Sequence, residues 1–343
     1  MTHWGSLLFI GVEGAAMTPP LRRLLERVQP GGVVLFERNL RTPAALRTFL
    51  SEIRKILDSP PFIAVDQEGG PVNRLRAFSF RAPSAWEISQ TNRPALAERQ
   101  GSLTGRALRL LGVNVDFAPV LDLSPPEAGN GIGVRSFSTQ PDVAARFAAA
   151  FLRGLKKERV LGCLKHFPGL GASSRDSHRV LPTVRKSRRR ILAEDVSPFA
   201  RLSGRAPFLM VGHGYYPAFS KRRVPADLDP AVGRVLLRGR LGYRGIVLSD
   251  DLAMRAVPEW ARRRRPEAFL RAGCDMLLVC RPGDVEPTAA RLREALGRCD
   301  APLAAHLRES LKRIARLKRR LPPPPGRFSA RAFEALRREM EIV

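Results

Sequence analysis

Polar side chains with catalytic chemistry follow three separate apolar runs of this sequence. Asp66 ends one run, Lys165 and His166 end another, and Asp250 ends a third. A carboxylate can act as a nucleophile or bind hydroxyl groups, and an ammonium or an imidazole can bind oxygen or move protons. Because residues so far apart in the chain share these chemistries, we expect the fold to bring them into one enzyme site.

A segment rich in glycine and serine carries a second candidate pair, Asp176 and His178. An imidazole near its ordinary pKa can donate a proton and later take one back, and a neighbouring carboxylate can orient it. A metal site is a further possibility, with ligands from Asp66, His166, Asp176, His178, His213 and Asp250. However, the sequence has no HxH at the end of a run and no HExxH, so we expect no metal and no cofactor.

Some polar residues near the ends of the apolar runs can have a structural role instead of a catalytic one. An aspartate after a strand often caps the next helix, which is our interpretation of Asp122 and Asp251. His213 is either part of the site or a hydrogen-bonded residue of the core.

The elements that must position these residues alternate in type. Eight short apolar runs predict strands, at Leu7–Val12, Gly32–Phe36, Phe62–Asp66, Val113–Pro119, Val160–His166, Phe208–His213, Gly245–Asp250 and Asp275–Cys280. Amphipathic stretches between and after them predict helices, among them Pro43–Leu57, Ala95–Leu111, Pro141–Lys157, Lys186–Leu202, Pro230–Leu241 and Ala304–Leu321. Continuously apolar strands indicate a parallel sheet that is buried on both faces.

This pattern predicts an α/β fold, a single-domain (β/α)8 TIM-type barrel over residues 1–300. We expect residues 301–343 to form a basic helical extension packed on the barrel. The alternative, an open doubly wound sheet, lacks a GxGxxG after its first strand. In a barrel the functional residues lie at the carboxyl ends of the strands. Lys165 and His166 are adjacent, so both can face the site only if their strand is irregular there.

Composition excludes several classes of protein. The 343 residues are 44% hydrophobic and 27% charged, which excludes a disordered chain. The four cysteines form no CxxC pair, and no run is long enough to span a membrane, so we expect a cytoplasmic protein.

The 59 Lys and Arg against 32 Asp and Glu give a net charge of +27. Either a polyanionic partner or a general replacement of lysine by arginine explains this charge. Because the basic residues are scattered, we favour replacement and expect no nucleic-acid partner.

Five motifs occur in an order that resembles glycoside hydrolase family 3, in particular its single-domain NagZ-type β-N-acetylglucosaminidases. They are DQEGG at 66–70 followed by Arg74, IGVRSF at 132–137, KHFPG at 165–169, DSH at 176–178 and SDDLAM at 249–254. The likeness runs from about Leu7 to Cys280.

The resemblance implies a retaining hydrolase that forms a covalent glycosyl-enzyme. Asp250 matches the family's nucleophile, and Asp176 and His178 match its acid/base dyad. The residues that would hold the sugar are Asp66, Arg74, Arg135, Lys165 and His166. The implied substrate is a muropeptide with terminal β-linked N-acetylglucosamine, cleaved during peptidoglycan recycling by a monomer.

The chain departs from the family pattern at four positions. Leu170 and Ala172 replace a histidine and an aspartate in the loop after the KHFPG motif, Pro71 replaces an arginine, and Val134 replaces an acidic residue. These changes bear on loop motion, leaving-group preference and rate.

Two rival functions remain at this point. One is a family 3 phosphorylase or a β-glycosidase of another specificity. The other is a catalytically impaired basic barrel that binds anionic polymers.

Overall fold

The computed structural model describes residues 4–173, 175–177 and 179–340. Eight parallel strands close into a barrel in the order β1-β10-β9-β8-β7-β6-β3-β2. Their bounds are β1 Leu8–Gly11, β2 Gly32–Leu35, β3 Phe62–Val65, β6 Val115–Asp116, β7 Leu161–Phe167, β8 Phe208–Val211, β9 Ile246–Asp251 and β10 Met276–Val279. Each lies within one of the predicted apolar runs or within one residue of it. The predicted (β/α)8 barrel is therefore confirmed.

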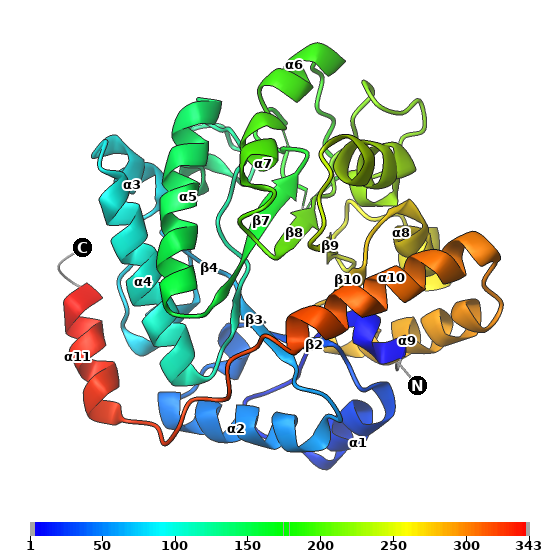
Figure 1. The fold of residues 1–343 in the computed structure, drawn as a ribbon. Helices are drawn as coiled ribbons and strands as arrows, with labels where there is room; N and C mark the ends of the chain where they lie inside the picture. The colour runs from blue at the N-terminus through cyan, green and yellow to red at the C-terminus, as the bar shows by residue number, and fades with distance from the viewer. Residues whose placement is uncertain (1–3, 174, 178, 341–343) are drawn as a thin grey trace.

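Helices surround this barrel (Figure 1). The longer ones are α1 Pro19–Val28, α2 Pro43–Ile56, α3 Ala85–Gln90, α4 Pro94–Leu111, α5 Pro141–Lys157, α6 Arg188–Ala193, α7 Ser197–Leu202, η6 Ala231–Arg240, α8 Glu267–Ala272, α9 Pro282–Gly297, α10 Ala301–Lys318 and α11 Ala330–Met340. Single turns form η1 Trp4–Leu7, η2 Glu37–Asn39, η3 Arg74–Phe78, η4 Gly133–Arg135, η5 Ala226–Leu228 and η7 Trp260–Arg264. A hairpin of β4 Gln67–Gly69 and β5 Val72–Asn73 follows β3.

Aromatic rings fill the barrel interior. The ring centroid of Phe9 lies 5.9 Å from that of Phe62 and 5.4 Å from that of Phe117. Phe208 completes the cluster, 5.1 Å from Phe62. A Cβ on Gly32 would lie 2.3 Å from a carbon of the Phe9 ring, so only glycine leaves room for this packing. The barrel is thus a packed core that holds its strand ends in place.

One predicted helix is divided. We expected Lys186–Leu202 to be continuous, but α6 ends at Ala193 and α7 begins at Ser197. Pro198 lies in the first turn of α7 and has no backbone N–H to donate to a preceding turn. Between the two helices, the fully buried carboxylate of Asp195 accepts a hydrogen bond of 2.7 Å from Lys186 Nζ.

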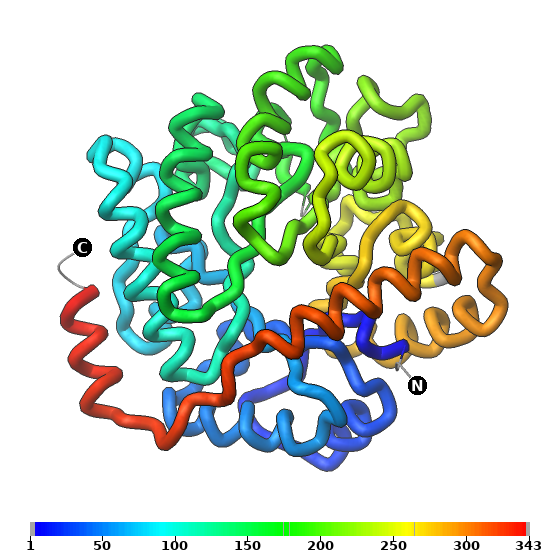
Figure 2. Tube along the Cα trace, viewed as in Figure 1, coloured from blue at the N-terminus to red at the C-terminus, as the bar shows by residue number. Residues whose placement is uncertain are grey.

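The last two helices lie on the outside of the barrel. α10 crosses the amino-terminal end of the strands, where Lys318 Nζ lies 5.6 Å from the centroid of the Phe62 ring. The chain then passes to α11, beside α4 (Figure 2). The ring of Phe333 on α11 packs against Phe78 and Phe80, with centroids 6.0 and 4.9 Å away.

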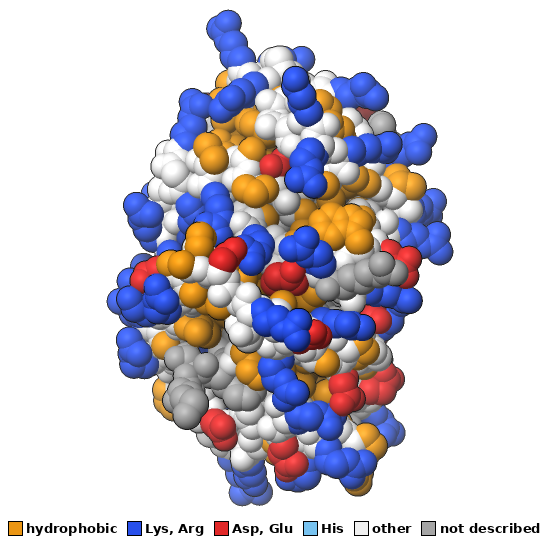
Figure 3. Space-filling view, turned by 90° about the vertical axis from the view of Figure 1, so that its right-hand side faces the viewer, with side chains coloured by type: hydrophobic (Ala, Val, Ile, Leu, Met, Phe, Trp, Pro, Cys, Tyr) orange, Lys and Arg blue, Asp and Glu red, His pale blue; other side chains and the backbone are white. Residues whose placement is uncertain are grey.

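One face of the surface carries its positive charge in a dispersed form. On this face, shown in Figure 3, Lys and Arg are scattered from end to end, with acidic and apolar side chains between them. Among the described residues, no helix is long and apolar enough to cross a membrane.

Candidate active site

A cavity of about 170 Å³ lies at the carboxyl ends of the strands. Seven of the eight predicted site residues line it, namely Asp66, Arg74, Arg135, Lys165, His166, Asp176 and Asp250. The eighth, His178, lies outside the described residues. The fold therefore brings together side chains from η3, η4, β7, β9, the residue directly after β3 and the loop after β7.

Lys165 and His166 both reach this cavity although they are neighbours on β7. The pairing of β7 with β8 shifts register between Leu164 and Phe167, and the Lys165–His166 peptide bond is cis. The strand is therefore irregular at the position where the sequence required it to be.

An ion-pair network forms one wall of the cavity. Lys165 Nζ lies 2.7 Å from Asp66 Oδ1 and 2.5 Å from Glu68 Oε1. Arg135 donates two hydrogen bonds to the same Glu68, from Nε to Oε2 at 2.7 Å and from Nη2 to Oε1 at 2.9 Å. Glu68 is thus the common acceptor that fixes both cations, a role that its place in the DQEGG motif did not predict.

The charges of this network reinforce one another. Burial opposes the charge on Glu68, but Arg135 and Lys165 outweigh it and hold its pKa well below the ordinary value. Burial likewise disfavours the Lys165 ammonium, but Asp66 and Glu68 raise its pKa above the ordinary value. Lys165 is therefore a permanent cation, suited to hold an oxygen rather than to transfer a proton.

His166 is oriented by a second carboxylate. Its Nδ1 lies 2.6 Å from Asp122 Oδ2. A carboxylate only accepts, so Nδ1 carries the proton and Nε2 remains available to a ligand. Asp122 Oδ1 also accepts a hydrogen bond of 2.6 Å from the backbone N–H of Leu170. The expectation that Asp122 caps a helix is therefore wrong: this aspartate positions a histidine and the loop after β7.

Asp250 is the second-last residue of β9 and is half-buried in the cavity wall. Its Oδ1 accepts a hydrogen bond of 2.8 Å from the backbone N–H of Asp251. Asp251 itself accepts from the backbone N–H of Ala253 and Cys280, at 3.0 and 3.1 Å. Asp251 thus holds the chain after β9 in place.

A buried pair supports this strand end from behind. His213 Nε2 lies 2.9 Å from the carbonyl oxygen of Asp251, and its Nδ1 lies 3.1 Å from Asp227 Oδ1. Burial alone would lower the pKa of His213, but the charge of Asp227 raises it to about 9. Both ring nitrogens face acceptors, so His213 is an imidazolium. Of its two interpretations, the hydrogen-bonded core residue is confirmed.

Asp176 approaches the backbone of a glycine across the cavity. A Cβ on Gly131 would lie 3.0 Å from the Asp176 carboxyl group. Gly131 also has a φ of +79°, and its carbonyl oxygen accepts a hydrogen bond of 2.8 Å from Arg135 Nη1. A glycine is needed here both for the backbone conformation and for the space that Asp176 occupies.

The departures from the family pattern lie around this cavity. Leu170 is buried and packs with Val120 and Ile132 in a small apolar cluster. Pro71 and Ala172 are exposed, and Val134 is half-buried. Among the described residues, no group of three or more His, Cys, Asp or Glu side chains is placed to hold a metal ion.

Comparison with known proteins decides the family. Residues 4–317 match the glycosyl hydrolase family 3 N terminal domain. The chain belongs to glycosyl hydrolase family 3. As a family 3 protein it is a glycoside hydrolase, and the resemblance seen in its motifs is confirmed.

Several known proteins are similar to this chain over most of its length. A beta-hexosaminidase of Pseudomonas aeruginosa is 38% identical over 280 residues, which cover 80% of this chain and 82% of the relative. A beta-hexosaminidase of Alkalilimnicola ehrlichii is 36% identical over 83% of each chain. The structure of a family 3 β-N-acetylglucosaminidase from Paenibacillus sp. superimposes with a TM-score of 0.91 at 30% identity, covering 99% of this chain and 67% of the other.

Proposed function

We propose that this family 3 hydrolase is a retaining β-N-acetylhexosaminidase that removes terminal β-linked N-acetylglucosamine from muropeptides derived from peptidoglycan. The names of its relatives support the sugar. The observation that carries the proposal is the placement of Asp250 at the end of β9, in one cavity with Asp66, Lys165 and Arg135. A volume of about 170 Å³ suits one terminal sugar better than the middle of a polymer.

The proposed reaction has two steps. In the first, an oxygen of Asp250 attacks the anomeric carbon, and the bond from that carbon to the leaving oxygen breaks as His178 donates it a proton. In the second, water attacks the glycosyl-enzyme, His178 takes the proton of that water, and the carboxylate of Asp250 is released. Asp176 would orient His178 and stabilise its imidazolium form.

The surrounding charges would hold the sugar. Lys165 and His166 Nε2 can hydrogen-bond hydroxyl oxygens, and Asp66 can accept from hydroxyl groups. Arg74 and Arg135 would hold the acetamido group and the remaining hydroxyls. The chain requires no cofactor in this scheme, and we propose that it acts as a cytoplasmic monomer.

Hydrolysis of a chromogenic N-acetyl-β-glucosaminide tests the proposal. We expect turnover by the wild type, release of the β-anomer in the first instance, and a loss of about 10³-fold or more in kcat for Asp250→Asn. Asp142→Asn is the matched control, since Asp142 is exposed and pairs with Arg201 on the surface at 2.7 Å. Absent wild-type turnover, or equal activity of the two variants, would refute the assignment. Production of a sugar 1-phosphate when phosphate is added would instead identify a phosphorylase.

A second experiment addresses the acid. His178→Ala should reduce cleavage of a muropeptide much more than cleavage of an aryl glycoside, whose leaving group needs little protonation. Equal losses on both substrates would exclude a proton-donating role for His178.

A further inference from the structure

A second and larger cavity lies at the opposite end of the barrel. It has a volume of about 760 Å³ and opens where β7, β8 and β9 begin. Leu161, Pro207 and Ile246 mark these strand starts, and the last turns of α5 and α10 flank them. We call it the basal cavity. Since barrel enzymes carry their chemistry at the other end, the glycosidase function gives this cavity no role.

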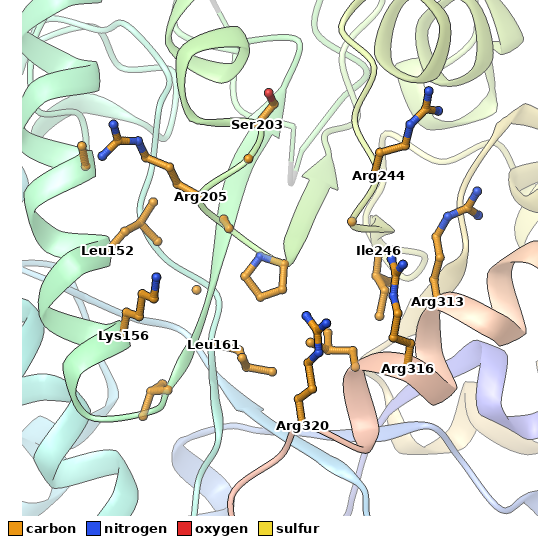
Figure 4. Close-up of a pocket in the computed structure, with 18 of the residues that line it drawn as sticks. Leu152, Lys156, Leu161, Ser203, Arg205, Arg244, Ile246, Arg313, Arg316 and Arg320 are labelled. Atoms are coloured by element: carbon orange, nitrogen blue, oxygen red, sulfur yellow. The ribbon is translucent and has the colours of Figure 1, made fainter.

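The basal cavity is lined by cations without acidic side chains. Its charged lining residues are Arg153, Lys156, Arg205, Arg244, Arg313, Arg316 and Arg320, and no Asp or Glu lines it. Figure 4 shows Lys156 and Arg205 on one side and Arg244, Arg313, Arg316 and Arg320 on the other, with Leu161 between them. The active-site cavity differs, because five carboxylates line it beside three basic residues.

Most of these cations have no internal partner. Arg153 pairs with Glu98 at 2.9 Å, and Arg313 pairs with Asp275 at 3.0 Å. Within the described part of the chain, the other five form no salt bridge, namely Lys156, Arg205, Arg244, Arg316 and Arg320. Like charges that line one cavity repel each other, so an anion in this cavity would be strongly favoured.

Helix ends explain only part of this arrangement. α5 and α10 end beside the cavity, and cations in a last turn stabilise a helix by interacting with its dipole. Lys156 and Arg316 lie in such turns. Arg205 and Arg244 lie on the loops before β8 and β9, outside any helix, and no helix dipole accounts for them.

We propose that the basal cavity binds a small anion that carries several phosphate groups. Guanidinium groups match phosphate oxygens with paired hydrogen bonds, and four of the five unpaired cations are arginines. The volume lies within the range of small-molecule sites, and its concave shape favours a compact ligand over a nucleic-acid duplex. Leu161, Ile246 and Leu317 provide an apolar wall for any part of the ligand that carries no phosphate, such as a nucleoside.

Calorimetric titration of the whole chain with inorganic triphosphate and with ATP, without divalent cations and at about 0.15 M salt, tests this proposal. We expect saturable binding of one triphosphate per chain, unchanged by excess N-acetylglucosamine. Tighter binding of ATP would identify a nucleotide as the ligand, and equal binding would identify the phosphate chain alone. Absence of saturable triphosphate binding, displacement by N-acetylglucosamine, or binding of a short DNA duplex in place of triphosphate would overturn the proposal.

Matched variants distinguish binding of triphosphate in the basal cavity from its general electrostatic attraction to a basic protein. The variant Arg205→Ser/Arg244→Ser/Arg320→Ser removes three exposed cations from the basal cavity. The control Arg22→Ser/Arg23→Ser/Arg99→Ser removes three exposed cations from α1 and α4, outside it. Triphosphate affinity should fall about tenfold or more in the first variant and less than about twofold in the control. Equal losses in both, with thermal unfolding unchanged, would mean that net charge alone attracts the ligand.

Discussion

His213 and Asp227 form a fully buried pair directly behind the end of β9, with Nδ1 and Oδ1 3.1 Å apart. The second ring nitrogen of His213 reaches the carbonyl oxygen of Asp251, the residue after the proposed nucleophile. The position of Asp250 thus depends on a histidine that does not line the active-site cavity.

This pair predicts a pH dependence of stability. The pKa of His213 is about 9 in the folded chain and 6.5 in an ordinary environment, so its stabilisation is fully present below pH 6.5 and is lost as the pH rises through 9. The difference corresponds to about 3 kcal/mol. Urea unfolding of the wild type and of His213→Gln between pH 6 and pH 9.5 should show this loss in the wild type alone. His306→Gln is the control and should keep the loss, because burial lowers the pKa of His306 whereas the pKa of His213 is raised. Parallel pH profiles for wild type and His213→Gln would contradict the assignment.

Replacement of Glu68 by a neutral side chain should have a large effect on stability and activity. Glu68→Gln leaves Lys165 and Arg135 without their common carboxylate, and breaking a buried ion pair costs about 3–5 kcal/mol. We expect lower stability in urea and a fall in kcat/KM of about 10²-fold. Glu98→Gln removes a carboxylate that pairs with Arg153 and Lys157 near the surface, and should cost about 0–1 kcal/mol without loss of activity. Similar results for the two variants would show that the buried network has no special role.

Asp122 is predicted to act on catalysis through His166. Asp122→Asn preserves the size of the side chain but removes the charge that selects the Nδ1–H tautomer. We expect kcat/KM to fall about 10- to 100-fold, because the His166 ring loses the acceptor that orients it. The measurement is kcat and KM of a chromogenic substrate together with stability in urea, with Asp142→Asn as the surface control. A drop in stability with unchanged kcat and KM would reduce Asp122 to a structural role.

Two glycines of one loop allow a matched test of Asp176. Gly131 and Gly129 both have positive φ, +79° and +62°, so alanine strains the backbone at either position. Only at Gly131 would the new Cβ meet Asp176, at 3.0 Å, whereas nothing lies within 4 Å at Gly129. We therefore expect similar losses of stability, about 1 kcal/mol each, but a fall in kcat of about tenfold or more for Gly131→Ala alone. Equal kcat values would argue against a catalytic role for Asp176.

Much of the candidate site followed from local sequence. Apolar runs identify the strands, and the residues that end them face one mouth of a parallel barrel because all the carboxyl ends of its strands lie on the same side. Asp66, Lys165 and Asp250 were found in this way. The motif also marks Leu170 as a departure, but its packing with Val120 and Ile132 depends on the tertiary structure.

The sequence by itself determined the alternation of strands and helices, the barrel, and the chain positions at which polar groups meet the cavity, because these depend on periodicity and on residue type. Only the tertiary structure decided the partners. Barrel closure brings Lys165 to Asp66 from 99 residues away, and His166 to Asp122 from 44. It also gathers the cations of the basal cavity around the starts of three strands. Such pairings depend on strand neighbours, register and side-chain direction, which are global properties of the closed sheet and leave no local pattern in the chain.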